Sequence, residues 1–237
     1  MLASIAWTLN SGSALDNPPA AANHDGVFYD NIAVQLNQGA GFSVDFHTPA
    51  WRSAYRDANT TPPLAQQYDW VMKYRGTGPT MLRSPGYPTV LAGVYRLFGY
   101  RLDAARICGC LLVSIALSML ANWIAHRWGV VAAIMFCGTV VLDYSVMHSA
   151  GMIGTESLAI FLLACTFLSA ASAVEKPSHV RWFCCGILFA LLLLTRGNWN
   201  LGLLIFLPLS ALMLFPAIGK RVPVSYTHLT LPTIYSV

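Results

Sequence analysis

The chain has 237 residues, of which 56% are hydrophobic and only 10% are charged, with a formal net charge of +4. Soluble domains typically carry about 25% charged residues, so this composition argues against a soluble protein and favours a membrane protein. The small positive excess does not indicate nucleic-acid binding, and we predict no nucleic-acid partner.

The N-terminal part differs from the rest of the chain. Residues 1–9 are apolar but too short to span a bilayer, and we interpret them as the end of a truncated first membrane helix, with a short membrane anchor as the alternative. Residues 10–103 mix Asn, Asp, Gly and Pro with many aromatic residues. This mixture suits a membrane interface or a sugar-binding cleft, and a loop with its own small core is the alternative.

A first short helix is predicted within residues 10–103. Phe28, Ile32 and Leu36 share one helical face, and Gly39 would end the helix. Asp25 would then lie at the N-terminus, where the helix dipole favours an anion. A simple capping role is therefore the alternative to a functional role for this carboxylate.

A second short helix is predicted over 83–99, with the sequence RSPGYPTVLAGVYRLFG. It begins after a Pro-Gly-Tyr-Pro break and ends at Gly99, with Arg83 at its head. At about 15 residues it is short for a membrane span, and this length is typical of an interfacial helix.

Five longer apolar segments follow, and they predict an all-α polytopic membrane bundle over 104–221. They are apolar all round, unlike the helices of a soluble core, which need a polar face. In the fourth, Arg181 and Arg196 would snorkel outward and extend the helix. We expect these helices at about 104–126, 128–148, 155–174, 180–197 and 200–219.

Loop charges predict the orientation of this bundle. Basic residues concentrate at the alternate junctions 126–127, 175–181 and 220–221, and such loops favour the cytoplasm. The remaining junctions, near Glu156 and Arg196, would then face outward, together with the segment that carries Asp25. Asp143 would lie near the outer end of its helix, paired with Arg196 or with a backbone group.

The C-terminal residues are interpreted separately. Residues 223–233, PVSYTHLTLPT, resemble the translation of a transposase mosaic-end adapter used in sequencing libraries. We therefore expect 222–237 to be an artefact that plays no part in the fold, and the native protein to continue with more helices.

Four segments carry a family resemblance: HDGVFYDNIAVQLNQGAGFS, RSPGYPTVLAGVYRLFG, TESLAIFLL and LTRGNWN. Their order and spacing resemble the N-terminal part of membrane glycosyltransferases of the GT-C fold, especially the family 39-like and Rgt-type enzymes. The resemblance implies transfer of a sugar from a polyprenyl-phosphate carrier on the extracytoplasmic face of a membrane, usually with inversion. It also implies a GT-C-type bundle whose outward first loop contains interfacial helices.

The resemblance assigns roles to particular residues. The family's acid in the first outward loop matches Asp25, and its acid at the start of a later helix matches Glu156. Its outward arginine matches Arg196. Some relatives carry a second acid in the first loop, where this chain has Gly26, so a role that needs two adjacent acids is in doubt. The family's interfacial segment matches Pro85-Gly86-Tyr87-Pro88.

The expected chemistry explains these residue types. A sugar on a lipid phosphate already has a good leaving group, so the enzyme must supply a base and positive charge. Asp25 is the candidate base, and Glu156 would position the acceptor or a divalent cation. Arg83 and Arg196 would hold the carrier phosphate through bidentate hydrogen bonds. Tyr29, Pro85 and Tyr87 complete the candidate substrate-binding residues.

Other functions stay open. Intramembrane acids and arginines are also typical of transporters, although we find no inverted repeat. The chain could also be an inactive fragment. Arg196 could serve only as a helix anchor and Glu156 only as a cap. No cofactor is required by the sequence; if a divalent cation binds, His24 and His148 are further candidate ligands. We expect the acceptor to be an envelope lipid, polymer or protein, and the location to be a bacterial inner membrane.

Overall fold

The computed structural model describes residues 24–46, 77–81 and 83–196, and this part of the chain is mostly helical. The predicted segments 1–9, 200–219 and 222–237 lie outside the described residues. The elements are α4 (His24–Asn37), β1 (Ser43–Val44), β2 (Gly78–Pro79), α7 (Gly86–Phe98), α8 (Leu102–Trp128), α9 (Val130–Leu142), α10 (Tyr144–Gly151), α11 (Thr155–Glu175) and α12 (His179–Thr195).

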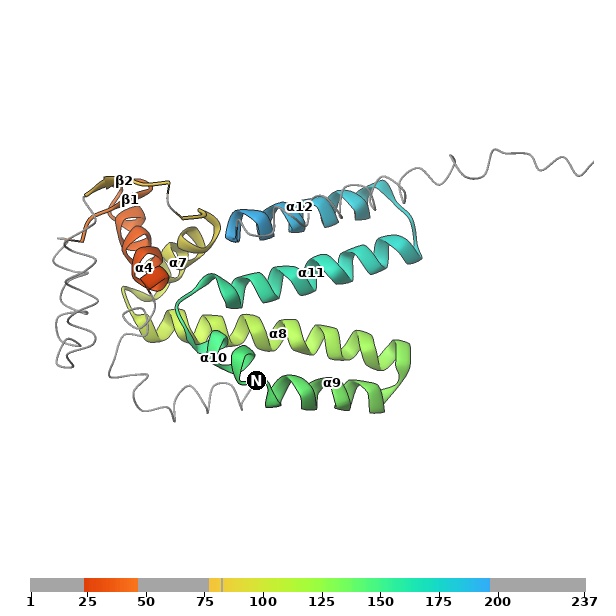
Figure 1. Ribbon diagram of the computed structural model, residues 1–237. Helices are drawn as coiled ribbons and strands as arrows, with labels where there is room; N and C mark the ends of the chain where they lie inside the picture. Colours follow the sequence, from red (N-terminus) through yellow and green to blue (C-terminus); the bar gives the residue numbers. More distant parts are fainter. Residues whose placement is uncertain (1–23, 47–76, 82, 197–237) are drawn as a thin grey trace, which may run out of the picture.

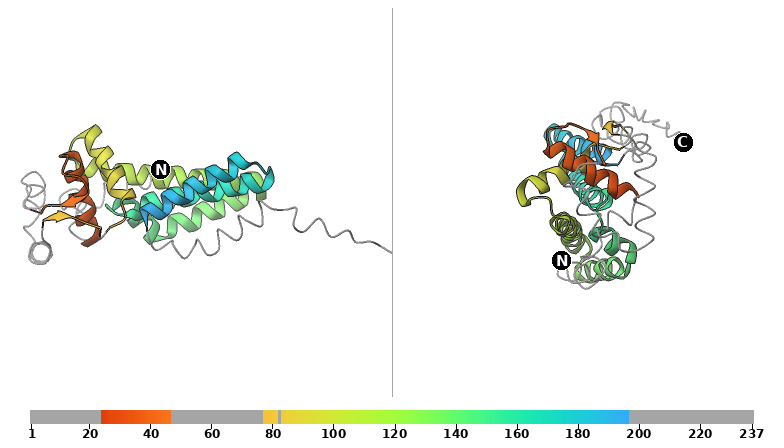
Figure 2. Two further views of the ribbon diagram at one scale, coloured as in Figure 1. Left: turned by 90° about the horizontal axis from the view of Figure 1, so that it is seen from above. Right: turned by 90° about the vertical axis from the view of Figure 1, so that its left-hand side faces the viewer.

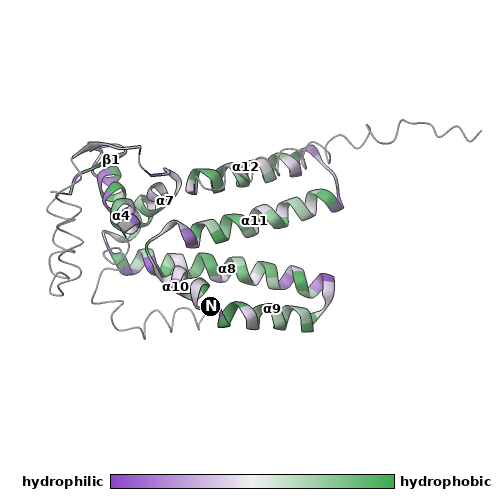
Figure 3. Cartoon of the chain, viewed as in Figure 1, coloured by the Kyte–Doolittle hydropathy of each residue, from purple (hydrophilic) through white to green (hydrophobic). Residues whose placement is uncertain are grey.

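Helices α8, α9, α11 and α12 lie side by side and form an apolar bundle (Figure 1; Figure 3). With 27 and 21 residues, α8 and α11 are about 40 and 32 Å long, enough to cross the roughly 30 Å hydrocarbon core of a bilayer. In the described part of the chain, two helices are long and apolar enough to span a membrane, or three if α9 and α10 form one bent span. The prediction of a helical membrane protein is confirmed to this extent.

The predicted single helix over 128–148 is wrong, because the chain breaks at Asp143. Helices α9 and α10 meet there at an angle of 67°. Asp143 has an extended backbone, and its Oδ1 accepts a hydrogen bond from the backbone N–H of Ser145 at 2.8 Å. An aspartate that caps a new helix in this way competes with continuation of the old one.

Helices α4 and α7 pack together at one end of the bundle, where α8 and α11 begin and α12 ends (Figure 1; Figure 2). One hydrophobic cluster continues from these two helices into α11 and α12, with Ile32 and Leu91 on one side and Leu158 and Leu192 on the other. The two predicted short helices are therefore present, and both are anchored on the bundle.

Helix α4 is buried more completely than its predicted apolar face requires, since positions 26–35 are all buried. Asn31 fixes the following turn, because its amide donates to the carbonyl of Asp45 at 2.9 Å and accepts from the N–H of Asp45 at 2.8 Å. Strands β1 and β2 then pair antiparallel. This two-residue ladder is a small departure from the all-α prediction.

A buried carboxylate locks α4 onto α7. Asp30 is fully buried, and its two oxygens accept hydrogen bonds from the phenols of Tyr95 and Tyr100, the latter at 2.7 Å. The two tyrosine rings contact each other edge to face, 5.0 Å apart. Because a buried polar group is costly when unpaired, this arrangement determines how the two helices dock.

Gly86 marks a close approach between α7 and the end of α12. A Cβ at this position would lie 2.8 Å from Thr195 Oγ1 and 2.9 Å from the backbone of Leu194. We expect Gly86→Ala to lower the free energy of unfolding by about 1–3 kcal/mol, through overpacking. Gly93→Ala in the same helix is the control, because no atom lies within 4 Å of its Cβ, and should be neutral or stabilising. Denaturation in detergent micelles measures both, and equal effects would contradict this close packing.

The Asp30 cluster predicts loss of stability at alkaline pH. Burial, and then the neighbouring Asp30, raise the pKa values of Tyr95 and Tyr100 above the usual value of 10.0. The unfolded chain therefore releases these protons first, so stability is complete below about pH 10 and falls as the pH rises above it. Unfolding measured between pH 8 and 12 should show this fall, with a shallower slope for Tyr100→Phe. An identical slope in both proteins would argue against the cluster.

Candidate functional site

Two carboxylate–arginine pairs lie at the same end of the bundle. Asp25, in the first turn of α4, pairs with Arg83 just before α7. Glu156, in the first turn of α11, pairs with Arg196 at the end of α12. The loop-charge argument predicted that these two acids share one face, and the structure brings them to one end.

The first pair rests on two aromatic rings. The guanidinium carbon of Arg83 lies 5.3 Å from the ring centre of Phe28 and 5.9 Å from that of Tyr29. The Arg83 side chain is 27% exposed, whereas that of Asp25 is 49% exposed. Arg83 Nε is buried and has no hydrogen-bond partner among the described residues. The pair thus presents an accessible carboxylate beside an arginine with donor capacity to spare.

The second pair borders a small pocket. Arg196 Nη1 lies 3.3 Å from Glu156 Oε1, and both side chains are about one-third exposed. The pocket has a volume of about 200 Å³ and a largely apolar lining. Besides the ion pair, it is lined by Ser145, Val146, Ser149, Ala159, Ile160 and Leu163.

Two buried tyrosines connect the pairs. The Tyr29 ring meets the Tyr87 ring edge to face, with ring centres 5.4 Å apart. Burial chiefly raises the pKa of Tyr29, with Asp25 as the next cause and Glu156 also contributing. Burial also raises the pKa of Tyr87 strongly. Both tyrosines belong to the hydrophobic cluster that also contains Ile153, just before α11, and they join α4 and α7 to that turn by packing.

The sequence-predicted substrate contacts occupy different environments. Tyr29 and Tyr87 are 7% and 6% exposed; the Tyr29 ring contacts the Arg83 guanidinium, and Tyr87 packs against Tyr29. Pro85 is exposed at the start of α7, where its carbonyl accepts from Thr89 Oγ1 at 2.7 Å. A direct contact between Pro85 and a ligand stays a prediction.

Sequence reasoning missed two structural partners of the site. Arg106 is 4% exposed, and its Nε donates to the carbonyl of Gly151 at 2.8 Å, which joins α8 to α10. Asp30, described above, had no signal in the sequence, because Tyr95 and Tyr100 lie 65 and 70 residues away. The structure also resolves the alternatives for Asp143, whose side chain accepts a hydrogen bond from the backbone N–H of Ser145 and so caps α10.

The described residues contain no group of three or more His, Cys, Asp or Glu side chains that could hold a metal ion. His148, a candidate ligand, stacks on Tyr144 with ring centres 5.2 Å apart. The side chain of His24 lies outside the described part. A divalent cation at Glu156 therefore stays a prediction.

No family model matches the chain, and no match was found among curated proteins or solved structures.

The partly exposed Glu156–Arg196 pair predicts a small contribution to stability. Because both side chains keep contact with solvent, screening leaves a coupling of less than about 1 kcal/mol. A double-mutant cycle with Glu156→Gln and Arg196→Gln, measured by unfolding in detergent, gives this coupling. A value of several kcal/mol would show that the pair is a structural lock.

Proposed function

We propose that this protein is a membrane glycosyltransferase that uses a polyprenyl-phosphate-linked sugar. The observation that carries the proposal is the placement of two carboxylate–arginine pairs at one end of an apolar bundle. One pair comes from the segment before the bundle and the other from the bundle itself. A lipid-linked phosphate needs both features, since its chain requires an apolar surface and its charge requires arginine. The family resemblance supports the same reaction.

In the proposed reaction, Asp25 accepts the proton of the acceptor hydroxyl. The hydroxyl oxygen then forms a bond to the anomeric carbon of the sugar, and the bond from that carbon to the phosphate oxygen breaks. The polyprenyl phosphate leaves with the bonding electrons, and Arg83 and Arg196 stabilise its charge. Glu156 orients the acceptor or a divalent cation. Attack opposite to the leaving group inverts the anomeric centre.

The charge distribution supports an extracytoplasmic site. Arg127, Lys176 and Arg181 lie at the other end of the bundle, where α8 and α11 end and α12 begins. Basic residues favour the cytoplasmic side of a membrane. We therefore place the paired acids on the outer face of a bacterial inner membrane, where an envelope lipid, polymer or protein serves as acceptor.

Asp25→Asn tests the base assignment. An amide cannot accept the proton, so we expect transfer to fall by about 10²–10⁴-fold. The native gene, its Asp25→Asn variant and an empty vector are compared in one host, and envelope glycans are quantified by mass spectrometry. Asp103→Asn, an equivalent change in the first turn of α8, is the control and should retain transfer. Transfer at the wild-type rate by Asp25→Asn would overturn the assignment.

A transporter is the second candidate, and the break at Asp143 favours it. Discontinuous helices whose ends face a binding site are typical of secondary transporters. The α9–α10 pair is such a broken helix, bent by 67°. Identical envelope glycans in all three strains would move the assignment toward transport, whereas a sugar added by the wild type alone would support the transferase.

A further inference from the structure

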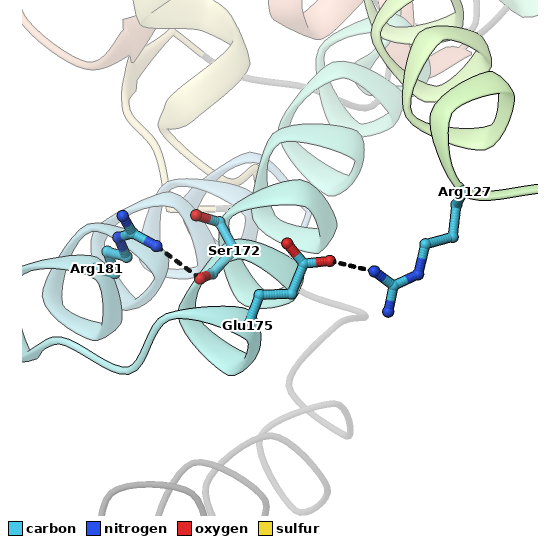
Figure 4. A network of polar contacts seen from close by, with 4 residues as sticks. All are labelled: Arg127, Ser172, Glu175 and Arg181. Carbon is cyan, nitrogen blue, oxygen red and sulfur yellow. Dashed lines mark hydrogen bonds and ion pairs between the residues drawn. The ribbon is translucent and has the colours of Figure 1, made fainter.

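The end of the bundle opposite the paired acids carries a basic cluster that the proposed reaction does not use. We call it the basic end and define it as Arg127, Glu175, Lys176 and Arg181. Arg127 Nη1 lies 2.8 Å from Glu175 Oε1. Arg181 Nη1 donates to the carbonyls of Ser172 and Lys176 at 3.0 and 3.3 Å. The two arginines approach the end of α11 from opposite sides, one from α8 and one from α12 (Figure 4).

The basic end has an uncompensated positive charge. Among the described residues it holds three cations and one carboxylate, which leaves a net charge of +2. Helix dipoles do not offset this charge, because two helices end there and two begin there. The two negative C-termini, of α8 and α11, cancel the two positive N-termini, of α9 and α12. The excess is therefore available to an anion from outside the chain.

Donor capacity is also left at the basic end. Within the described part of the chain, Arg127 and Arg181 each donate hydrogen bonds through Nη1. Their Nη2 and Nε groups can therefore donate to a further acceptor. Lys176 is exposed next to them. A phosphate oxygen accepts several such charge-assisted bonds at once, which is the geometry that arginine favours.

The surroundings place this charge at a membrane interface. Trp128 is 64% exposed and contacts Trp123 edge to face at 5.0 Å, and tryptophan is enriched at the boundary between water and hydrocarbon. On α12, Val180 and Phe183 flank Arg181 and are 69% and 68% exposed. A ligand with a phosphate group and an acyl chain would contact both kinds of surface.

We propose that the basic end binds the headgroup of an anionic phospholipid. The phosphate binds at Lys176 and Arg181, the acyl chain follows the exposed apolar residues of α12, and Arg127 adds positive charge from the other side of α11. Basic sites between membrane helices on the cytoplasmic side are known to bind such headgroups. This proposal does not depend on the transferase assignment, because it uses other residues at the other end of the bundle.

Variants that change the net charge of the basic end in steps of one unit test the proposal, and all of them keep Arg181. Glu175→Gln raises the net charge of the basic end to +3, Lys176→Gln lowers it to +1, and Lys176→Glu brings it to zero. We expect the affinity for phosphatidylglycerol to change about fivefold per unit charge, in this order. Native mass spectrometry of the whole chain in detergent, with added phosphatidylglycerol or phosphatidylcholine, measures the retained lipid.

Glu175→Gln separates lipid binding from structure. A purely structural role for the Arg127–Glu175 pair predicts lower thermal stability and unchanged lipid retention in this variant. The proposal predicts about fivefold stronger retention of phosphatidylglycerol, because Arg127 is released. Unchanged or weaker retention would overturn it, as would equal retention of the two lipids by the wild type.

Two further measurements locate the site. Arg96→Gln removes the same charge from an exposed position of α7, at the other end of the molecule, and should leave retention unchanged. A loss equal to that of Lys176→Gln would show that net charge alone determines binding, and would overturn the proposal. Inorganic phosphate should not displace the lipid; displacement would identify a site for free phosphate instead.

Discussion

The inability of hydrocarbon to solvate charge determines where function can lie in this molecule. Each long helix satisfies its own backbone hydrogen bonds, so its interior can be apolar, but a charged side chain within it is expensive. Accordingly, the stretches 107–126, 128–142, 157–174 and 182–195 contain no Asp, Glu, Lys or Arg. The charged residues of α8 to α12 gather at the two ends. Chemistry that needs carboxylates and arginines is thereby restricted to these ends, and the two ends differ in their charge balance.

At the end with the paired acids, buried contacts hold the geometry more firmly than the half-exposed ion pairs do. The half-exposed pairs are screened by solvent and contribute little to stability. Tyr29 and Tyr87 are buried, their rings meet edge to face, and both belong to the hydrophobic cluster that includes Ile153 in the turn before α11. Asp30 adds a second such constraint between α4 and α7. Buried contacts therefore position the carboxylates of Asp25 and Glu156, and these carboxylates themselves contribute little to stability. They can serve in the proposed chemistry instead.

Hydropathy predicted the long helices, because these follow from local composition. Loop charges predicted the shared location of Asp25 and Glu156, because successive membrane helices place alternate loops on the same side. They did not predict the break at Asp143, since a single capping side chain decides between one helix and two. They also missed the buried role of Asp30, which depends on tyrosines contributed by a distant segment. Helical periodicity places a polar residue on the solvent side by default. It fails where a second layer of protein, here α7 and its C-terminal turn, covers that side.

The ion pair between Asp25 and Arg83 also limits how the proposed reaction can proceed. The guanidinium of Arg83 contacts one carboxylate oxygen of Asp25, so a donor phosphate that binds Arg83 must share this cation with Asp25. When a donor phosphate binds to Arg83, the two anions compete for the same cation, and the Asp25 oxygen that contacted Arg83 can turn toward the acceptor hydroxyl. Donor binding would in this way activate the base only when a sugar is in place to receive the attack. Arg83 Nε is buried and has no hydrogen-bond partner among the described residues, so this group can donate to the phosphate without giving up a hydrogen bond of its own.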